Sequence, residues 1–244
     1  LELRNWPAYR SRDDRPILRN ISLHVRKGEI VGIAGLMGSG RTELAQSIFG
    51  NAGSYRLQGE LYFENKPRTF RHPKEAIQAG IAYVTEDRKG DGLFLSKDIK
   101  SNITAAKLQN IAGKMMINHN EEIKVANAYK DSLLIKTPSV EQLVGNLSGG
   151  NQQKVSLGKW LFVEPKLLIL DEPTRGIDVG AKYEIYTIMN ELIAEGMSIM
   201  MISSELGEVL GMSDRVYVMA EGQIKGEITA DQADQEKIMQ LATQ

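Results

Sequence analysis

The segment GLMGSGRT, which runs from Gly35 to Thr42, decides the fold of this chain. The apolar run GEIVGIAG leads into it and TELAQSIFG follows it, so the pattern predicts a buried strand, a tight turn and a helix that ends at Gly50. The outline is that of a phosphate-binding loop, G-x-x-x-x-G-K-[ST], with Arg41 at the lysine position. Whether such a loop holds a nucleotide depends on what the rest of the sequence places near it.

Glycines at this spacing allow several backbone N–H groups to point inward at phosphate oxygens, and the positive end of the following helix favours the same anion. Thr42 adds a hydroxyl for Mg²⁺. Arg41 supplies a positive charge through a planar fork that is bulkier and more directional than an ammonium group. A glycine-rich turn that binds nothing is the alternative at this point. The candidate nucleotide-binding residues of the loop are Gly35, Leu36, Met37, Gly38, Ser39, Gly40, Arg41 and Thr42.

Two adjacent acids, Asp171 and Glu172, end the apolar run of LLILDEPT. A strand buried on both faces is nearly all apolar, and ligands bind beyond the carboxyl ends of parallel strands. At such a place Asp171, together with Thr42, can hold the water shell of Mg²⁺, and Glu172 can orient a water molecule that attacks a γ-phosphate. Two surface acids at a strand end are the simpler interpretation, which the phosphate loop upstream makes less favoured.

The third motif is LSGGNQQK, in front of a helical pattern, with Ser148 as a candidate N-cap. Gly149 and Gly150 allow the backbone to approach an anion closely, and a helix start favours negative charge. An ordinary capped helix start explains the motif when it is taken alone. The order of phosphate loop, LSGG segment and acidic strand end is far more specific than any one of the three.

The whole chain has 244 residues, 42% of them hydrophobic, a formal net charge of -1 and no cysteine. The balanced charge gives no reason to expect a nucleic acid partner. Without cysteine, a disulfide framework and a thiolate metal site are both excluded. No apolar run approaches the roughly 18–20 residues that cross a bilayer. The chain begins with Leu1 rather than Met, and we expect it to be part of a longer protein.

Strand and helix patterns alternate before and after a middle section that is helical throughout. We expect an α/β fold, with a mostly parallel sheet covered by helices on both faces and antiparallel strands at the ends. The expected division is an α/β core at 1–88 and 165–244, with a helical insertion at 89–164. Within the core, Trp6, Tyr9 and the charged run RSRDDRP are expected to form an exposed loop and a solvated turn, and the segment around Glu221 a hairpin.

Together the three motifs resemble the nucleotide-binding domain of an ATP-binding cassette (ABC) transporter, over essentially the whole chain. GLMGSGRTEL, TEDRKGDGL, LSGGNQQKV, DEPTRGIDVGAK and SSELGEVLGMSDR are together similar to the second cassette of bacterial monosaccharide importers, which take up ribose, galactose, xylose or arabinose. The resemblance implies a P-loop NTPase (RecA-like) core with an antiparallel β subdomain and an inserted helical subdomain. It also implies that ATP and Mg²⁺ bind and that ATP hydrolysis drives sugar uptake.

In that family two cassettes close head to tail around two ATP molecules. The resemblance implies that residues 35–42, Asp171 and Glu172 serve one site, while Ser148, Gly149 and Gly150 complete the site of the partner. The implied partners are an N-terminal cassette of the same polypeptide, transmembrane permease subunits and, indirectly, a periplasmic or extracellular sugar-binding protein. The implied location is the cytoplasmic face of the bacterial inner membrane. Tyr9 and Trp6 are candidates for stacking on adenine, with ordinary packing favoured for both.

Three residues depart from the family pattern: Arg41 replaces the loop lysine, Glu86 a glutamine, and Ser204 a histidine that contacts the γ-phosphate. Losing one group that stabilises transition-state charge commonly costs about 10²–10³ in rate, whereas the backbone cradle still binds ATP. We therefore expect catalytic roles at Glu172, Ser204 and Glu86, with slow hydrolysis in this cassette's own site. The segment RGID at 175–178 occupies the place of the family's dimer-crossing loop, SALD.

Three other functions compete with this interpretation. A non-hydrolysing regulatory module of the same transporter remains open, although the intact Glu172 argues against it. A soluble ribosome-associated cassette also remains open, and would lack a permease encoded nearby. A chromosome-maintenance ATPase is disfavoured, because the roughly one hundred residues between the phosphate loop and LSGG carry no sustained heptads.

Overall fold

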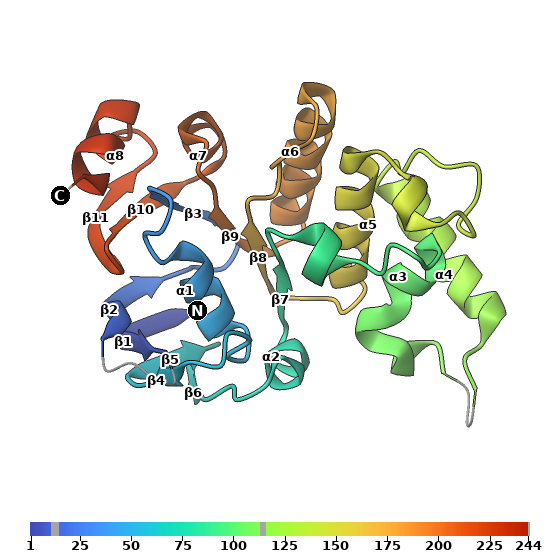
Figure 1. Cartoon of the computed structure of the whole chain (residues 1–244), viewed down its shortest axis with the longest axis horizontal. Coiled ribbons are helices and arrows are strands. Elements are labelled where there is room, and N and C mark those ends of the chain that lie inside the picture. The colour runs from blue at the N-terminus through green and yellow to red at the C-terminus, as the bar shows by residue number, and fades with distance from the viewer. Residues whose placement is uncertain (11–14, 113–115, 244) are drawn as a thin grey trace. The chain divides into compact units, whose positions relative to one another are not determined.

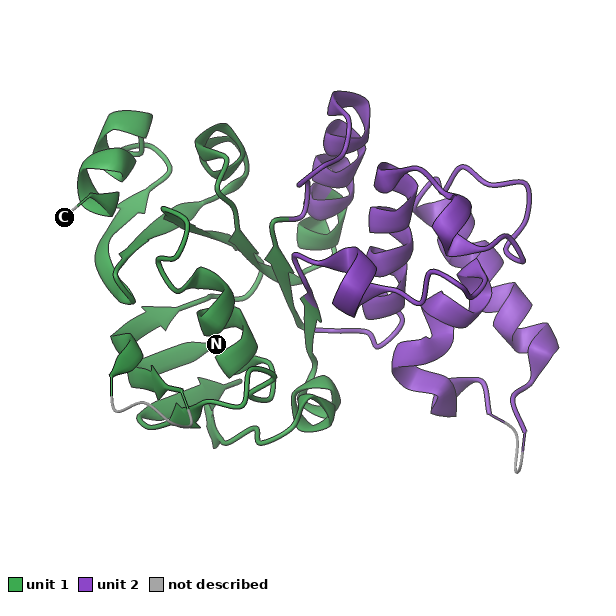
Figure 2. Ribbon diagram, viewed as in Figure 1, with its two compact units in different colours: residues 1–83, 166–172, 191–244 green, residues 84–165, 173–190 purple. Residues whose placement is uncertain are grey.

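The computed structural model describes residues 1–10, 15–112 and 116–243 of the chain. The chain divides into two compact units, shown in Figure 2. The first unit comprises Leu1–Tyr83, Lys166–Glu172 and Glu191–Gln244, and the second comprises Val84–Pro165 and Pro173–Asn190. Residues 173–190 thus group with the helical section rather than with the α/β core.

The larger sheet of the first unit has the strand order β11–β10–β3–β9–β8–β7. β10, β3, β9 and β8 pair in parallel, and β11 joins β10 as the antiparallel strand of the predicted hairpin. Every residue of β8 and β9 is buried, as the apolar runs predicted. The strands are β3 (Ile30–Gly35), β7 (Ile81–Val84), β8 (Leu167–Asp171), β9 (Ser198–Ile202), β10 (Arg215–Ala220) and β11 (Gln223–Thr229).

Helices cover both faces of this sheet, which confirms the predicted fold class. α1 (Arg41–Ile48) packs against β3 and β8 on one face, and α7 (Leu206–Met212) and α8 (Gln235–Ala242) pack against β3 and β10 on the other, as Figure 1 shows. α1 follows β3 directly, so the strand–turn–helix order read from the sequence is present. The carboxyl ends of β3, β8 and β9 therefore share one edge of the sheet.

A second, antiparallel sheet has the order β2–β1–β5–β6, with β4 also paired to β1. The helix α2 (Pro73–Ala79), which the sequence patterns did not predict, connects this sheet to β7. The strands are β1 (Glu2–Tyr9), β2 (Pro16–His24), β4 (Arg56–Leu57), β5 (Glu60–Phe63) and β6 (Lys66–Arg68).

The expectation of an exposed loop at the start of the chain is wrong, because residues 2–9 form β1. Leu3, Trp6 and Ala8 are buried, and the indole of Trp6 donates a hydrogen bond to Ser47 Oγ at 3.0 Å. Register shifts between Leu3 and Tyr9 interrupt the alternation of buried and exposed residues. The predicted solvated turn falls largely on residues 11–14, which lie outside the described residues.

The second unit is mainly helical, as predicted. Its helices are α3 (Ile99–Thr104), α4 (His119–Ser132) and α5 (Gly149–Leu161), joined by short helical turns at Arg88–Gly92, Ala105–Asn110 and Val144–Asn146. The helical turn at Ala105–Asn110 is interrupted, because Lys107 has non-helical torsion angles. α6 (Val179–Ala194) begins in the second unit and ends in the first. Within the described residues, no helix combines the length and the apolar character that crossing a bilayer requires.

Candidate functional site

The predicted phosphate loop joins β3 to α1 in the first unit. Gly38 and Gly40 have φ values of 81° and 98°, a left-handed conformation that glycine adopts without strain. Gly40 occupies the N-cap position of α1, and no side chain caps the helix. The first N–H groups of α1 are therefore not satisfied by a cap, as an anion site at a helix start requires. The side chains of Leu36 and Met37 are exposed to solvent. They therefore do not pack into the interior of the loop, where its backbone N–H groups would meet a phosphate.

Asp171 ends β8 and is completely buried. Its Oδ2 atom accepts a hydrogen bond from the Tyr83 hydroxyl at 3.0 Å, whereas its Oδ1 atom has no hydrogen-bond partner among the described residues. Burial raises the pKa of this carboxyl from 3.8 to about 6, although the hydroxyls of Thr42 and Tyr83 partly lower it. A buried carboxylate oxygen without a partner, beside a threonine of the phosphate loop, fits a ligand of a hydrated Mg²⁺ ion.

Glu172 follows Asp171 and is held by residues from two other segments. Its Oε1 atom lies 3.5 Å from Nη2 of Arg41, and its Oε2 atom accepts a hydrogen bond from the Ser204 hydroxyl at 3.0 Å. Its backbone has a φ of 49°, and its N–H donates to the carbonyl of Ile202 at 2.8 Å. Both carboxylate oxygens therefore have partners, and both partners are residues that depart from the family pattern.

Arg41 is the first residue of α1, and its side chain is buried. Its Nη1 atom donates to the carbonyl of Ser203 at 2.6 Å, next to Ser204 in the chain. Burial lowers the pKa of the Arg41 guanidinium, and the carboxylates of Glu172 and Asp171 partly offset this. The guanidinium thus points toward Glu172, which follows β8, and toward the carbonyl of Ser203, which follows β9. The first unit brings Arg41, Thr42, Asp171, Glu172 and Ser204 together.

The LSGG segment lies at the start of α5 in the second unit. Ser148 has the predicted N-cap position, but its hydroxyl accepts from the side chain of Asn151 at 3.0 Å and makes no capping hydrogen bond. An added Cβ on Gly149 would lie 3.0 Å from Nη2 of Arg88, and one on Gly150 would lie 2.5 Å from Cβ of Ala181. Packing within the unit therefore favours glycine at position 150 strongly and at position 149 more weakly, besides any approach to an anion.

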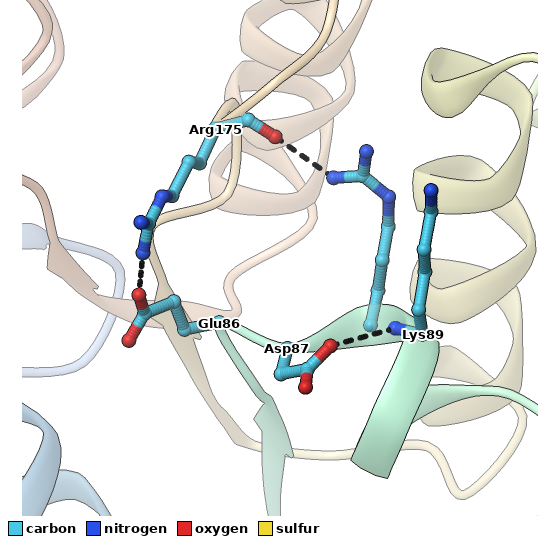
Figure 3. A pocket seen from close by; sticks show the side chains of 5 residues that line it. Glu86, Asp87, Lys89 and Arg175 are labelled. Carbon is cyan, nitrogen blue, oxygen red and sulfur yellow. Dashed lines mark hydrogen bonds and ion pairs between the residues drawn. The ribbon is translucent and has the colours of Figure 1, made fainter.

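Glu86 lies in the same unit, in a polar pocket of about 400 Å³ lined by Glu86, Asp87, Arg88, Lys89 and Arg175. Its carboxylate forms an ion pair with the guanidinium of Arg175, as Figure 3 shows. Nη1 of Arg88 donates to the carbonyl of Arg175 at 2.8 Å, and Nη2 donates to the carbonyl of Gly176 at 3.4 Å. Asp87 accepts from the backbone N–H groups of two residues, Lys89 and Gly90.

Three functional contacts were missed from the sequence. Tyr83 holds Asp171, Arg88 holds the turn at 175–176, and the carbonyl of Ser203 holds Arg41. For Tyr83 and Arg88 the sequence offered only their positions as a signal. Tyr83 lies near the end of an apolar strand pattern, and Arg88 lies in the charged segment that follows it.

The two aromatic residues considered for stacking on adenine differ in their surroundings. Trp6 is buried in the antiparallel sheet, while the ring of Tyr9 is half-exposed and lies beneath the guanidinium of Arg56, 4.9 Å from the ring centroid.

Comparison with known proteins gives a consistent result. The model of the family described as "ABC transporter" matches residues 18–175. The chain is 55% identical over 243 residues to the L-arabinose transport ATP-binding protein AraG of Geobacillus stearothermophilus, covering 99% of this chain and 47% of that protein. It is 53% identical over 243 residues to the xylose import ATP-binding protein XylG of Thermoanaerobacter pseudethanolicus, covering 99% of this chain and 48% of that protein.

Among solved structures, an ATP-binding cassette of an ABC transporter matches with a TM-score of 0.83 and 25% identity, over 98% of this chain and 97% of that one. The chain thus spans about half the length of the curated relatives that it matches, and nearly all of an isolated cassette.

Proposed function

The chain belongs to the ABC transporter family, and from this premise we propose that it is an ATP-binding and ATP-hydrolysing cassette that helps to power monosaccharide uptake. The observation that carries the proposal is the meeting of the phosphate loop with Asp171 and Glu172 at one edge of the parallel sheet in the first unit. The names of the two relatives, an arabinose and a xylose transporter, support a pentose or a similar sugar as the cargo.

The residues of the first unit fit the binding of ATP as substrate. In the proposal, backbone N–H groups of residues 35–42 hold the phosphates, and the charge of Arg41 adds to the attraction. Thr42 and Asp171 would hold Mg²⁺, which would neutralise charge on the phosphoryl group that is transferred. The buried Oδ1 atom of Asp171, which lacks a hydrogen-bond partner among the described residues, supports this assignment. Glu172 orients the attacking water.

We further propose that hydrolysis in this site is slow. A carboxylate that already has a partner on each oxygen is a weaker acceptor for an attacking water molecule and is less free to turn toward it. Here Arg41 lies against one oxygen of Glu172 and Ser204 donates to the other. Serine is also too short to take the place of an imidazole, and its hydroxyl does not titrate near neutral pH. Weakening one such group commonly costs about 10²–10³ in rate.

The second unit supplies the other half of the proposal. Ser148, Gly149 and Gly150 would complete the ATP site of a companion cassette, while residues 35–42 of this chain bind their own nucleotide. The chain's match to about half of each relative is consistent with one of two cassettes in one polypeptide. We propose that it is the second, because its motifs resemble those of second cassettes. Transmembrane permease subunits, fed by a sugar-binding protein, would hold the assembly at the cytoplasmic face of the membrane.

The test is the double substitution Arg41→Lys with Ser204→His in the tandem subunit assembled with its permease. It is expected to raise ATP turnover, because it restores the loop lysine and supplies at position 204 an imidazole that can exchange a proton near neutral pH. The same double substitution combined with Glu172→Gln is the control, and there no rise is expected. Unchanged turnover together with tighter ATP binding would refute the proposal of slow hydrolysis.

A second candidate is a cassette that binds ATP for regulation and never hydrolyses it. The engagement of both oxygens of Glu172 favours it. Single-turnover assays with radiolabelled ATP separate the two, when the companion cassette is inactivated by substitution of its own catalytic glutamate. Slow release of phosphate supports the first candidate, and none over many hours supports the second.

A further inference from the structure

Two of the unusual residues in this chain carry opposite charges and lie against each other. Glu86 stands where the resembled family has a glutamine, and Arg175 opens the segment RGID, where the family has SALD. The two come from different loops of the second unit, and their side chains form an ion pair (Figure 3). The negative charge of Glu86 is therefore neutralised within its own unit, where it would otherwise repel an anionic ligand.

The turn that contains Arg175 is also held through its backbone. Arg88, two residues after Glu86, donates to the carbonyls of Arg175 and Gly176 at 2.8 and 3.4 Å. Burial lowers the pKa of Arg88 and the nearby Asp87 partly restores it. Residues 86–88 thus hold the turn at 175–176 in two ways. The carboxylate of Glu86 pairs with the side chain of Arg175, and the guanidinium of Arg88 donates to the backbone carbonyls of the turn.

The same guanidinium lies next to the LSGG segment. An added Cβ on Gly149 would be 3.0 Å from Nη2 of Arg88 and 3.2 Å from the carbonyl of Gly176. A side chain there would require Arg88 or the turn to shift by a few tenths of an ångström, so Gly149 is closely packed against both. We therefore expect a shift of the turn at 175–176 to disturb the start of α5.

We propose that Glu86 and Arg175 form a positioning pair, in which Glu86 acts through Arg175 to fix the turn at 175–178 against the glycines of the LSGG segment. Neither residue is then a catalytic residue. Their effect falls on the companion site, because Gly149 and Gly150 are the residues proposed above to complete it. The expected effect on hydrolysis rests on the proposed function. The coupling between the two loops does not.

The size of the effect follows from exposure. The side chains of Arg175 and Glu86 are 58% and 36% exposed, and partly exposed ion pairs contribute little because water and salt screen them. We expect Glu86→Gln or Arg175→Gln alone to lower the turnover of the assembled transporter by about two- to fivefold. The KM for ATP is expected to change by less than about twofold, because the loop that binds this chain's own nucleotide is untouched.

The deciding variant is the exchange of the two charges, Glu86→Arg with Arg175→Glu. A positioning pair is expected to work in either orientation, so the exchanged variant should recover turnover to within about twofold of the parent. A Glu86 that touched nucleotide or metal would not be rescued in this way. Lys89→Gln is the matched control, because it removes another cation of the same pocket, one that forms no hydrogen bond or ion pair with the turn among the described residues. It should leave turnover unchanged.

Hydrogen exchange on the present chain gives a readout independent of hydrolysis. Each single variant should speed exchange of the backbone N–H groups at 175–178 and 149–152, and the exchanged pair should restore the parent rates, with equal thermal midpoints showing that all variants fold. Parent exchange rates in both single variants would overturn the proposal. So would an exchanged pair no better than the single variants in both assays. If exchange responds and turnover is absent throughout, the pair stands and the proposed function fails.

Discussion

The pKa of Asp171 shows how much a buried candidate site residue lowers the free energy of unfolding. The carboxyl is fully buried, and its pKa is raised from 3.8 to about 6. A difference of about 2 units at 1.36 kcal/mol each corresponds to about 3 kcal/mol. The ionised carboxylate therefore destabilises the nucleotide-free protein by an amount of that order at neutral pH. Asp171→Asn removes the charge while keeping the shape and an oxygen that can accept from Tyr83.

The pH dependence has a defined sign. Between pH 3.8 and about 6 the folded protein keeps a proton that the unfolded chain has released, so the free energy of unfolding of the parent falls as pH rises. In Asp171→Asn this decrease in the free energy of unfolding is absent, because asparagine does not titrate. The advantage of the variant is expected to be small near pH 4 and to reach its full value above pH 6. For a chain of this size, about 3 kcal/mol raises the unfolding temperature by roughly 5–10 °C.

The assay is urea and thermal unfolding of both proteins at pH 4.5, 6 and 7.5, first without and then with excess MgATP. With MgATP the order should reverse or narrow, because ligand binding stabilises the parent and the variant has lost a proposed metal ligand. Asp231→Asn, at an exposed position, is the control and should change nothing. A variant no more stable than the parent at pH 7.5, or equally favoured at every pH, would refute the reasoning.

Two further predictions concern stability. Gly150→Ala should lower the free energy of unfolding by about 1–3 kcal/mol, because its Cβ would lie 2.5 Å from that of Ala181; Gly211→Ala, with open space around it, should not lower it when both are measured by urea unfolding. Arg215→Ala should cost about 3–5 kcal/mol, because it leaves the buried carboxylate of Glu29 without its ion-pair partner at 2.8 Å; a thermal midpoint unchanged from the parent would contradict this.

The sequence predicted the elements whose signals are local. β8 was recognised because each of its residues is apolar until Asp171, and the phosphate loop because three glycines follow a buried strand. β1 was missed because its register shifts and Pro7 break the alternation that marks a strand. Ser148 was placed at the correct helix boundary, but the partner of its hydroxyl was not predictable from spacing alone.

The contacts between distant segments could not be predicted in this way. The sequence identified Arg41, Glu86 and Ser204 as departures from a pattern, yet nothing in it indicated that Arg41 and Ser204 share Glu172, or that Glu86 faces Arg175. Such pairings depend on where the fold brings chain segments together. Arg88 donates to main-chain carbonyls. Because every residue has a carbonyl, the sequence does not indicate which residues accept such hydrogen bonds.

The most direct test of the central claim is a calorimetric titration of this chain with ATP in the presence of Mg²⁺. If the curled backbone of residues 35–42 and the buried Asp171 hold a triphosphate, the titration should give saturable heat below millimolar nucleotide. Gly38→Val, which places a branched side chain at a φ of 81°, should weaken binding by at least about tenfold. Absence of saturable heat from the folded parent protein at millimolar MgATP would contradict the account.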